Sequence, residues 1–108
     1  MSSDWVDVCA VGAIDREDVT RFDHGTRTFA VYRTRDDRWF ATDGECTHGQ
    51  AHLAEGYVEG TVIECPKHNG RFDLCTGKAK GTPATEDLAI HPVRVESGRV
   101  QLFVAAPQ

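Results

Sequence analysis

Two short segments decide the fold and the chemistry of this chain: Cys46-Thr47-His48-Gly49 and Cys65-Pro66-Lys67-His68. Each segment carries one cysteine and one histidine, so each can form a loop that directs one thiolate and one imidazole to the same point. The residues between them include 57–64, whose pattern predicts a hairpin that returns the second loop beside the first. The two loops together predict a four-ligand metal site formed by Cys46, His48, Cys65 and His68.

The order of the ligands distinguishes between two kinds of metal site. A zinc finger normally supplies two cysteines from its first half and two histidines from its second, whereas here each half mixes the two ligand types. In a Rieske centre the two thiolates bind one iron and the two imidazoles bind the other, so each loop must supply one ligand to each iron. The order C-x-H followed by C-x-x-H therefore favours one Rieske-type 2Fe-2S cluster, and a mononuclear zinc site is the alternative.

Length, composition and charge limit the remaining function classes. A chain of 108 residues with 40% hydrophobic and 27% charged residues is typical of one folded domain, which we expect to span 1–108, with the cluster-binding loops within about 44–84. The net charge of -5 argues against a nucleic-acid partner, because such proteins neutralise phosphates with Lys and Arg. No segment has the apolar length of a membrane span or the pattern of a signal peptide, so we expect a cytoplasmic protein with no membrane contact. In that reducing compartment the four cysteines are expected to be thiols or metal ligands.

Most of the chain predicts short antiparallel strands. Apolar and polar residues alternate in 5–8, and turn residues separate the candidate hairpin pairs 28–33 with 38–42, 58 with 62–63, and 93–95 with 100–104. A short helical turn is predicted over 14–19, with Asp15 as its cap, and a long surface loop over 77–83. The fold class is therefore mainly β.

Several conspicuous residues are expected to lie outside the metal site. Cys9 and Cys75 are expected to be small buried side chains, and His52 a surface histidine, because both imidazole positions of the cluster are already filled. Several of the aromatic residues are expected in the core, namely among Trp5, Trp39, Phe22, Phe29, Phe40, Phe72 and Phe103. The sequence has no nucleophile and base motif, no phosphate-binding glycine loop and no oxygenase iron triad, so catalysis by this chain alone is not expected.

The two metal-binding segments, together with Gly70-Arg71-Phe72-Asp73 and Thr76-Gly77-Lys78-Ala79, resemble the cluster-binding boxes of the Rieske ferredoxins of bacterial aromatic-ring dioxygenase systems. The resemblance extends over nearly the whole chain. It implies an antiparallel β-sandwich with a small cluster-binding subdomain at one tip, and it places the proline-containing loop 81–84 over the cluster.

The resemblance also implies a function. The chain would be a soluble, monomeric one-electron carrier, not an enzyme, that takes electrons from a NAD(P)H-dependent flavin reductase and passes them to a terminal Rieske oxygenase through transient contacts. Two alternatives are a small Rieske subunit of a nitrite-reductase-like or arsenite-oxidase-like complex, and a zinc-stabilised interaction module without a redox role.

Four positions depart from the Rieske proteins of respiratory and photosynthetic complexes. Those relatives usually carry a bridging cysteine pair where this chain has Ala51 and Lys67, and hydroxyl side chains that donate to the cluster sulfurs where it has Gly70 and Phe72. A hydrogen bond to sulfur favours the reduced state, so the resemblance implies a reduction potential near the bottom of the Rieske range.

Overall fold

The fold is built from three antiparallel sheets in the part of the chain that the structure describes. The structure is a computed structural model that describes residues 4–47, 51–67, 70–80 and 86–105. Two 3-10 turns accompany the strands, and no helix in these ranges has the length and apolar character needed to cross a membrane. The mainly β, antiparallel fold class predicted from the sequence is confirmed.

Two of the sheets form the body of the molecule. The larger has the strand order β2-β3-β4-β8, with bounds β2 (Asp18–His24), β3 (Arg27–Arg33), β4 (Trp39–Asp43) and β8 (Ile90–His91). The other has the order β1-β10-β9, with bounds β1 (Asp4–Ala10), β10 (Arg99–Val104) and β9 (Val93–Glu96). The hairpins predicted over 28–42 and 93–104 are both present as β3-β4 and β9-β10.

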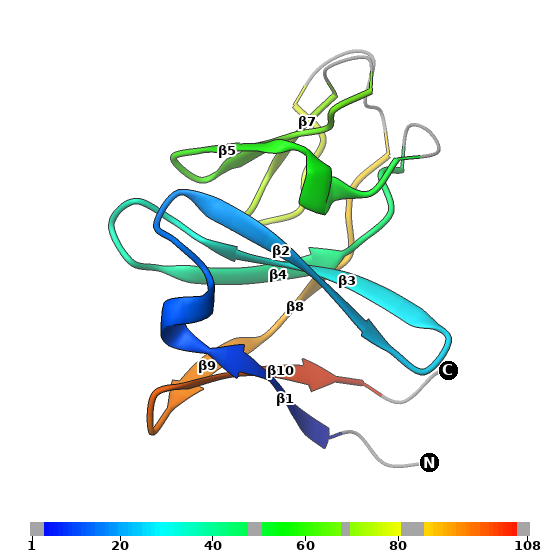
Figure 1. Cartoon of the computed structure of the whole chain (residues 1–108). Coiled ribbons are helices and arrows are strands. Elements are labelled where there is room, and N and C mark those ends of the chain that lie inside the picture. The colour runs from blue at the N-terminus through cyan, green and yellow to red at the C-terminus, as the bar shows by residue number, and fades with distance from the viewer. Residues whose placement is uncertain (1–3, 48–50, 68–69, 81–85, 106–108) are drawn as a thin grey trace.

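The third sheet forms a small subdomain of its own. Its order is β5-β6-β7, with bounds β5 (Tyr57–Glu59), β6 (Val62–Glu64) and β7 (Arg71–Asp73), and the 3-10 turn η2 (Leu53–Glu55) precedes it. Figure 1 shows this sheet at one end of the molecule, with the β2-β3-β4-β8 sheet between it and strands β1 and β10. The predicted 58–63 hairpin is therefore confirmed as β5-β6, and the predicted subdomain at one tip is present.

The short helical turn predicted over 14–19 is wrong. The 3-10 turn η1 (Val11–Ala13) lies earlier, and Asp18 already begins β2. Glu17 has a φ of 60°, which interrupts a right-handed helix before the strand starts. Pairing of β2 with β3 along seven residues, from Asp18 opposite Arg33 to His24 opposite Arg27, satisfies more backbone groups than one helical turn could.

Strand β3 is buried on both faces and divides the core in two. Phe29 and Val31 face the sandwich core, which is formed by the buried residues Ile14, Phe29, Val31, Ala41, Val100 and Leu102. Ala30 and Tyr32 face the cluster-side core, which is formed by the buried residues Ala30, Tyr32, Cys46, Leu53, Val58, Ile63, Cys65, Phe72, Leu74 and Leu88. Because successive side chains of a strand point to opposite faces, four consecutive buried residues place β3 at the centre of the molecule.

The phenol of Tyr32 is the polar group placed deepest in the cluster-side core. Its hydroxyl donates to Thr42 Oγ1 at 2.8 Å, and the Thr42 hydroxyl donates in turn to the Asp43 carbonyl at 2.8 Å. Burial raises the pKa of Tyr32, so the phenol stays neutral. One hydrogen-bonded pair thus joins β3 to β4 beneath the subdomain.

We expect Tyr32→Phe to lower the melting temperature of the protein by about 4–8 °C, because a buried hydrogen bond contributes about 1 kcal/mol in a domain of this size. Circular dichroism during thermal unfolding measures the change. Tyr57→Phe is the matched control, since Tyr57 is 66% exposed, and it should leave the melting temperature unchanged. Equal effects of the two variants would contradict the role of the Tyr32 hydroxyl.

Candidate metal centre

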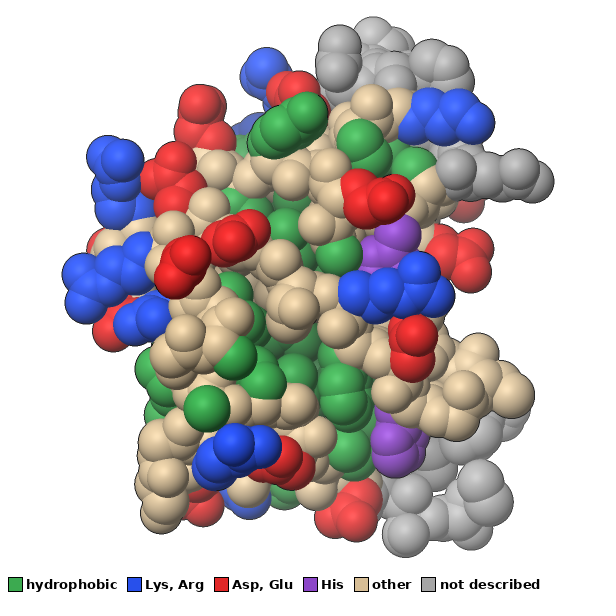
Figure 2. Space-filling view, viewed as in Figure 1, with side chains coloured by type: hydrophobic (Ala, Val, Ile, Leu, Met, Phe, Trp, Pro, Cys, Tyr) green, Lys and Arg blue, Asp and Glu red, His purple; other side chains and the backbone are tan. Residues whose placement is uncertain are grey.

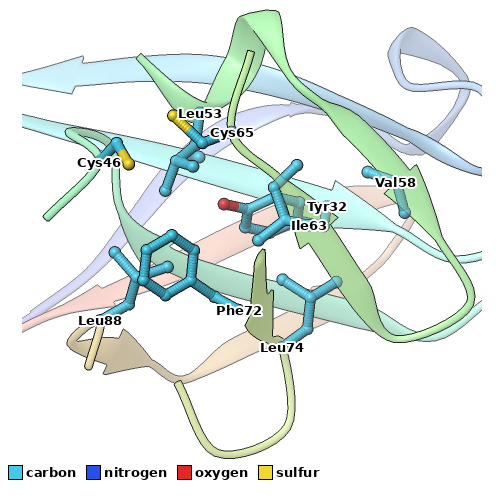
Figure 3. Packing of buried hydrophobic residues seen from close by; sticks show 10 residues of the cluster. Tyr32, Cys46, Leu53, Val58, Ile63, Cys65, Phe72, Leu74 and Leu88 are labelled. Carbon is cyan, nitrogen blue, oxygen red and sulfur yellow. The ribbon is translucent and has the colours of Figure 1, made fainter. Parts of the chain in front are cut away.

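The two predicted cysteine ligands lie together at one end of the cluster-side core. Cys46 is 5% exposed and Cys65 is 0% exposed, and Figure 3 shows both beside Leu53 at the same end of this core. Burial, followed by the effect of the nearby Cys46 thiol, raises the pKa of Cys65. Two adjacent buried thiols would be poor nucleophiles but suitable ligands, because a bound metal ion replaces their protons.

Antiparallel pairing closes the base of the first loop. The Cys46 N–H donates to the Ala51 carbonyl at 2.9 Å, and Glu45 forms a β-bridge with His52. The Leu53 N–H donates to the Gly44 carbonyl at 2.8 Å, which continues the same ladder. The backbone therefore enters the loop at Cys46 and leaves it at Ala51, two points that this pairing holds together.

The second loop is closed in the same way. The Cys65 N–H donates to the Gly70 carbonyl at 2.6 Å, and Glu64 pairs with Arg71 across β6 and β7. The Lys67 backbone lowers the pKa of Cys65, against the larger effect of burial. Each loop thus begins at a cysteine that is also the last paired residue of its strand ladder.

A third segment adjoins the two loops. The Thr47 hydroxyl donates to the Glu86 carbonyl at 2.7 Å, and the Leu88 side chain is buried in the cluster-side core. The Leu88 N–H donates to the Gly77 carbonyl at 2.7 Å, so this segment is also fixed to the turn after β7. The loop 81–84, which the sequence resemblance places over the cluster, lies outside the described residues, as do His48 and His68.

Three residues that the sequence analysis placed outside the site occupy distinct environments. Cys9 is half-buried against the sandwich core, and Cys75 is exposed in the turn after β7, so the prediction of a buried side chain is wrong for Cys75. Its backbone N–H donates to Asp73 Oδ1, which holds Cys75 in the tight turn and leaves its side chain in solvent. None of the four cysteines forms a disulfide.

His52 is not the surface histidine expected from the sequence. It is half-buried, and both of its ring nitrogens are engaged: Nδ1 accepts the Ala54 N–H at 3.0 Å, and Nε2 lies 2.8 Å from Thr28 Oγ1. The sequence carried little signal for this role, because Ser, Thr, Asp and Asn are the usual capping residues. His52 is thus occupied with the protein and is not available as a ligand.

Comparison with known proteins assigns this arrangement to a family. Residues 4–92 match the Rieske [2Fe-2S] domain, so the chain belongs to that family. It carries one Rieske-type 2Fe-2S cluster, and the buried cysteine pair at the ends of two loops fits the thiolate half of such a cluster.

The chain is similar over nearly its full length to ferredoxins of dioxygenase systems, which confirms the resemblance seen in the sequence. It is 42% identical over 102 residues to the ferredoxin component of the naphthalene 1,2-dioxygenase/salicylate 5-hydroxylase systems of Ralstonia sp, covering 94% of this chain and 97% of that protein. It is 40% identical over 102 residues to the ferredoxin component of the naphthalene 1,2-dioxygenase system of Pseudomonas putida, with the same coverage.

Solved structures give the same result for the fold. A chain in the complex of reduced oxygenase and oxidized ferredoxin in carbazole 1,9a-dioxygenase matches with a TM-score of 0.86 and 37% identity, covering 96% of this chain and 97% of that one. A putative NADH-dependent nitrite reductase small subunit from Mycobacterium tuberculosis also has a TM-score of 0.86, but at 19% identity it shows a shared fold alone.

Gly56 lets η2 and β5 lie directly against the end of β6. A methyl group on Gly56 would overlap the Glu64 carbonyl oxygen, which is backbone and cannot move aside. We expect Gly56→Ala to cost about 1–3 kcal/mol and to reduce the iron content, because the displaced backbone leads directly into Cys65. Iron analysis and thermal unfolding measure both effects. Gly12→Ala is the control, since nothing lies within 4 Å of the added carbon; an equal loss of iron in both variants would contradict the packing argument.

Proposed function

We propose that Cys46, His48, Cys65 and His68 hold the cluster, with the two cysteines on one iron and the two histidines on the other. The contact between the two buried thiols supports the cysteine half. Within the described ranges, no group of three or more His, Cys, Asp or Glu side chains is placed to hold a metal ion. The two imidazoles would therefore come from residues outside these ranges, and His48 and His68 follow the cysteines closely in both loops.

We infer that the chain is a one-electron carrier of an aromatic-ring dioxygenase system and not itself an enzyme. The observation that carries this function is the full-length similarity to ferredoxin components at about 40% identity, with the cysteine pair in the expected loops. Bound there, a 2Fe-2S cluster with two thiolate and two imidazole ligands accepts and releases one electron at a higher potential than an all-cysteine cluster. The chain's own residues hold this cluster at one tip and shield its thiolate side.

Burial of the two cysteines fixes the direction of electron exchange in this proposal. The Cys46 and Cys65 sulfurs face the cluster-side core, so the electron would pass through the histidine side of the site. The partners would be a NAD(P)H-dependent flavin reductase and a terminal Rieske oxygenase, each docking at this tip through an interface below roughly 1,200 Å². Figure 2 shows acidic and basic side chains mixed over the face viewed.

We further propose that residues 1–108 act as a single, monomeric Rieske domain in the cytoplasm, with the cluster loops within about 44–84. Cys9 and Cys75, the two cysteines outside the proposed ligand set, form no disulfide, which supports a reducing compartment, where disulfides are rare. The net charge of -5 supports protein partners over nucleic acid. The alternative of a nitrite-reductase-like subunit has only the shared fold in its favour.

The ligand set is tested with the four cysteines, because two of them are proposed ligands and two are natural controls. Cys46→Ala and Cys65→Ala should each abolish cluster assembly, since each removes one of the two thiolates on one iron. Cys9→Ala and Cys75→Ala should retain about two irons and two acid-labile sulfides per chain. Iron and sulfide analysis with visible absorption measures the outcome, and a colourless, zinc-loaded protein would refute the cluster assignment altogether.

His48→Ala and His68→Ala complete the test. Each should lose the cluster or its characteristic spectrum, whereas His24→Ala, in an exposed position of β2, should keep both. An unchanged spectrum in His48→Ala or His68→Ala would remove that residue from the ligand set.

The carrier function requires a low reduction potential, and two described residues near the thiols, Gly70 and Phe72, carry no hydroxyl donor. Phe72 is fully buried in the cluster-side core and Gly70 is buried beside Cys65, and neither has a hydroxyl to offer a sulfur. We therefore expect a midpoint of about -150 mV, within reach of nicotinamide-linked reduction.

Direct electrochemistry tests this value, and a midpoint above roughly +100 mV at neutral pH would exclude the carrier function. Phe72→Tyr combined with Gly70→Ser should raise the potential by adding donors near the sulfurs. Phe103→Tyr adds the same hydroxyl in β10, in the sheet at the far side of the molecule, and should leave the potential unchanged.

A further inference from the structure

His52 stands at the centre of a hydrogen-bonded chain that joins three elements to the base of the first cluster loop. Its Nδ1 accepts the Ala54 N–H of η2 at 3.0 Å, and its Nε2 lies 2.8 Å from Thr28 Oγ1 in β3. The Thr28 hydroxyl donates to Asp23 Oδ1 in β2 at 2.6 Å. The β2-β3 hairpin is thereby connected to the backbone that leaves the loop.

The partners of His52 determine its protonation state. Thr28 has one hydroxyl proton, which it donates in its hydrogen bond to the Asp23 carboxylate, so Thr28 Oγ1 must accept a hydrogen bond from His52 Nε2–H. The Ala54 backbone N–H can only donate, so Nδ1 must carry a free lone pair. The imidazole is therefore neutral and protonated at Nε2, and a proton added to Nδ1 would set two donors against each other.

The ring also lies directly on the backbone that leads to Cys46. A methyl group on Gly44 would overlap the His52 Nε2, so the imidazole occupies the space that a side chain at residue 44 would fill. The Gly44 N–H donates to the Thr28 carbonyl at 2.9 Å. His52 and Thr28 thus hold the strand end from which the first loop starts.

The charged groups around His52 shift its pKa in opposite directions, and burial has the largest effect. Burial and then Arg21 of β2 lower the pKa of His52, against the smaller effects of Asp23, Glu55 of η2 and Glu45 of the loop base. The Thr28 hydroxyl and then Arg21 lower the pKa of Asp23, so the acceptor end of the chain stays ionised. The neutral ring is the form that both the hydrogen bonds and the burial favour.

We propose that His52 is a positioning residue of the cluster site, whose neutral imidazole locks the first cluster loop onto the β2-β3 hairpin and whose protonation releases that lock. The inference rests on the proposed function only in taking Cys46 as a ligand. A histidine whose pKa is lowered in the fold stabilises it fully above the ordinary histidine pKa of 6.5, and this stabilisation is lost as the pH falls below that value. The protein should therefore hold the cluster less tightly as the pH falls below 6.5.

The test measures the rate at which the holoprotein loses its visible absorbance to an iron chelator, from about pH 8 to about pH 5. In the wild-type protein this rate should rise as His52 becomes protonated. His52→Ala removes both hydrogen bonds and should lose the cluster about tenfold faster at neutral pH. His52→Asn should restore most of the neutral-pH retention, because its Oδ1 can accept the Ala54 N–H, and its rate should depend less on pH because Asn does not titrate.

Two further variants test whether the chain acts as a unit. Thr28→Val removes the central hydroxyl, and the double variant Thr28→Val/His52→Ala should lose the cluster no faster than His52→Ala alone. His24→Asn is the matched histidine control in β2 and should reproduce the wild-type rate and pH profile. Fully additive effects in the double variant would contradict a shared lock.

The outcomes separate this inference from the ligand assignment. Normal iron content in His52→Ala with a wild-type rate of cluster loss would overturn the positioning role and leave the ligand set intact. A His52→Asn protein with the wild-type pH profile would also overturn it. Absence of iron from His52→Asn as well as from His52→Ala would overturn the positioning role, because an Asn that keeps the Ala54 hydrogen bond should retain the cluster.

Discussion

The convergence of two buried cysteines, Cys46 and Cys65, on one end of the cluster-side core is the constraint on which the rest of this structure depends. Cys46 and Cys65 come from two loops, and antiparallel pairing closes each loop separately at its base. The two cysteines meet because the β5-β6 hairpin brings the chain back beside the first loop. A site made from two separate loops depends more on rigid strand pairing at the base of each loop than on many contacts between the loops. The three short strands of the subdomain supply that rigidity with few residues.

The support continues through β3 into the body of the molecule. Ala30 and Tyr32 lie under the cysteines, while Phe29 and Val31 on the opposite face of the same strand belong to the sandwich core. Because one strand contributes to both cores, neither can repack without moving the other. The packing around the metal site is therefore coupled to the packing of the whole domain, although the site lies at one tip.

The sequence predicted those features that depend on local patterns. The hairpins around 36–37, 60 and 97–98 follow from strand alternation and turn residues, and the metal-binding segments follow from ligand spacing. The sequence did not predict strand β2, because the acidic residues Glu17 and Asp18 are also typical of the first turn of a helix. Pairing with β3 makes this segment a strand. The role of His52 could not be predicted, because Thr28 lies 24 residues away and only the folded chain brings the two together. Positions of His48 and His68 stay predictions.

Strands β1 and β10 lie side by side in a sheet separated from the cluster subdomain by the β2-β3-β4-β8 sheet (Figure 1). Their pairing runs from Asp4 opposite Val104 to Ala10 opposite Arg99. This geometry places the β1-β10 pair and the cluster subdomain at different ends of the protein. A linker attached at this edge would fix the molecule to an electrode or to a fused reductase with the cluster subdomain facing outward. The fold itself would then set the orientation that small carriers normally lose when they are immobilised.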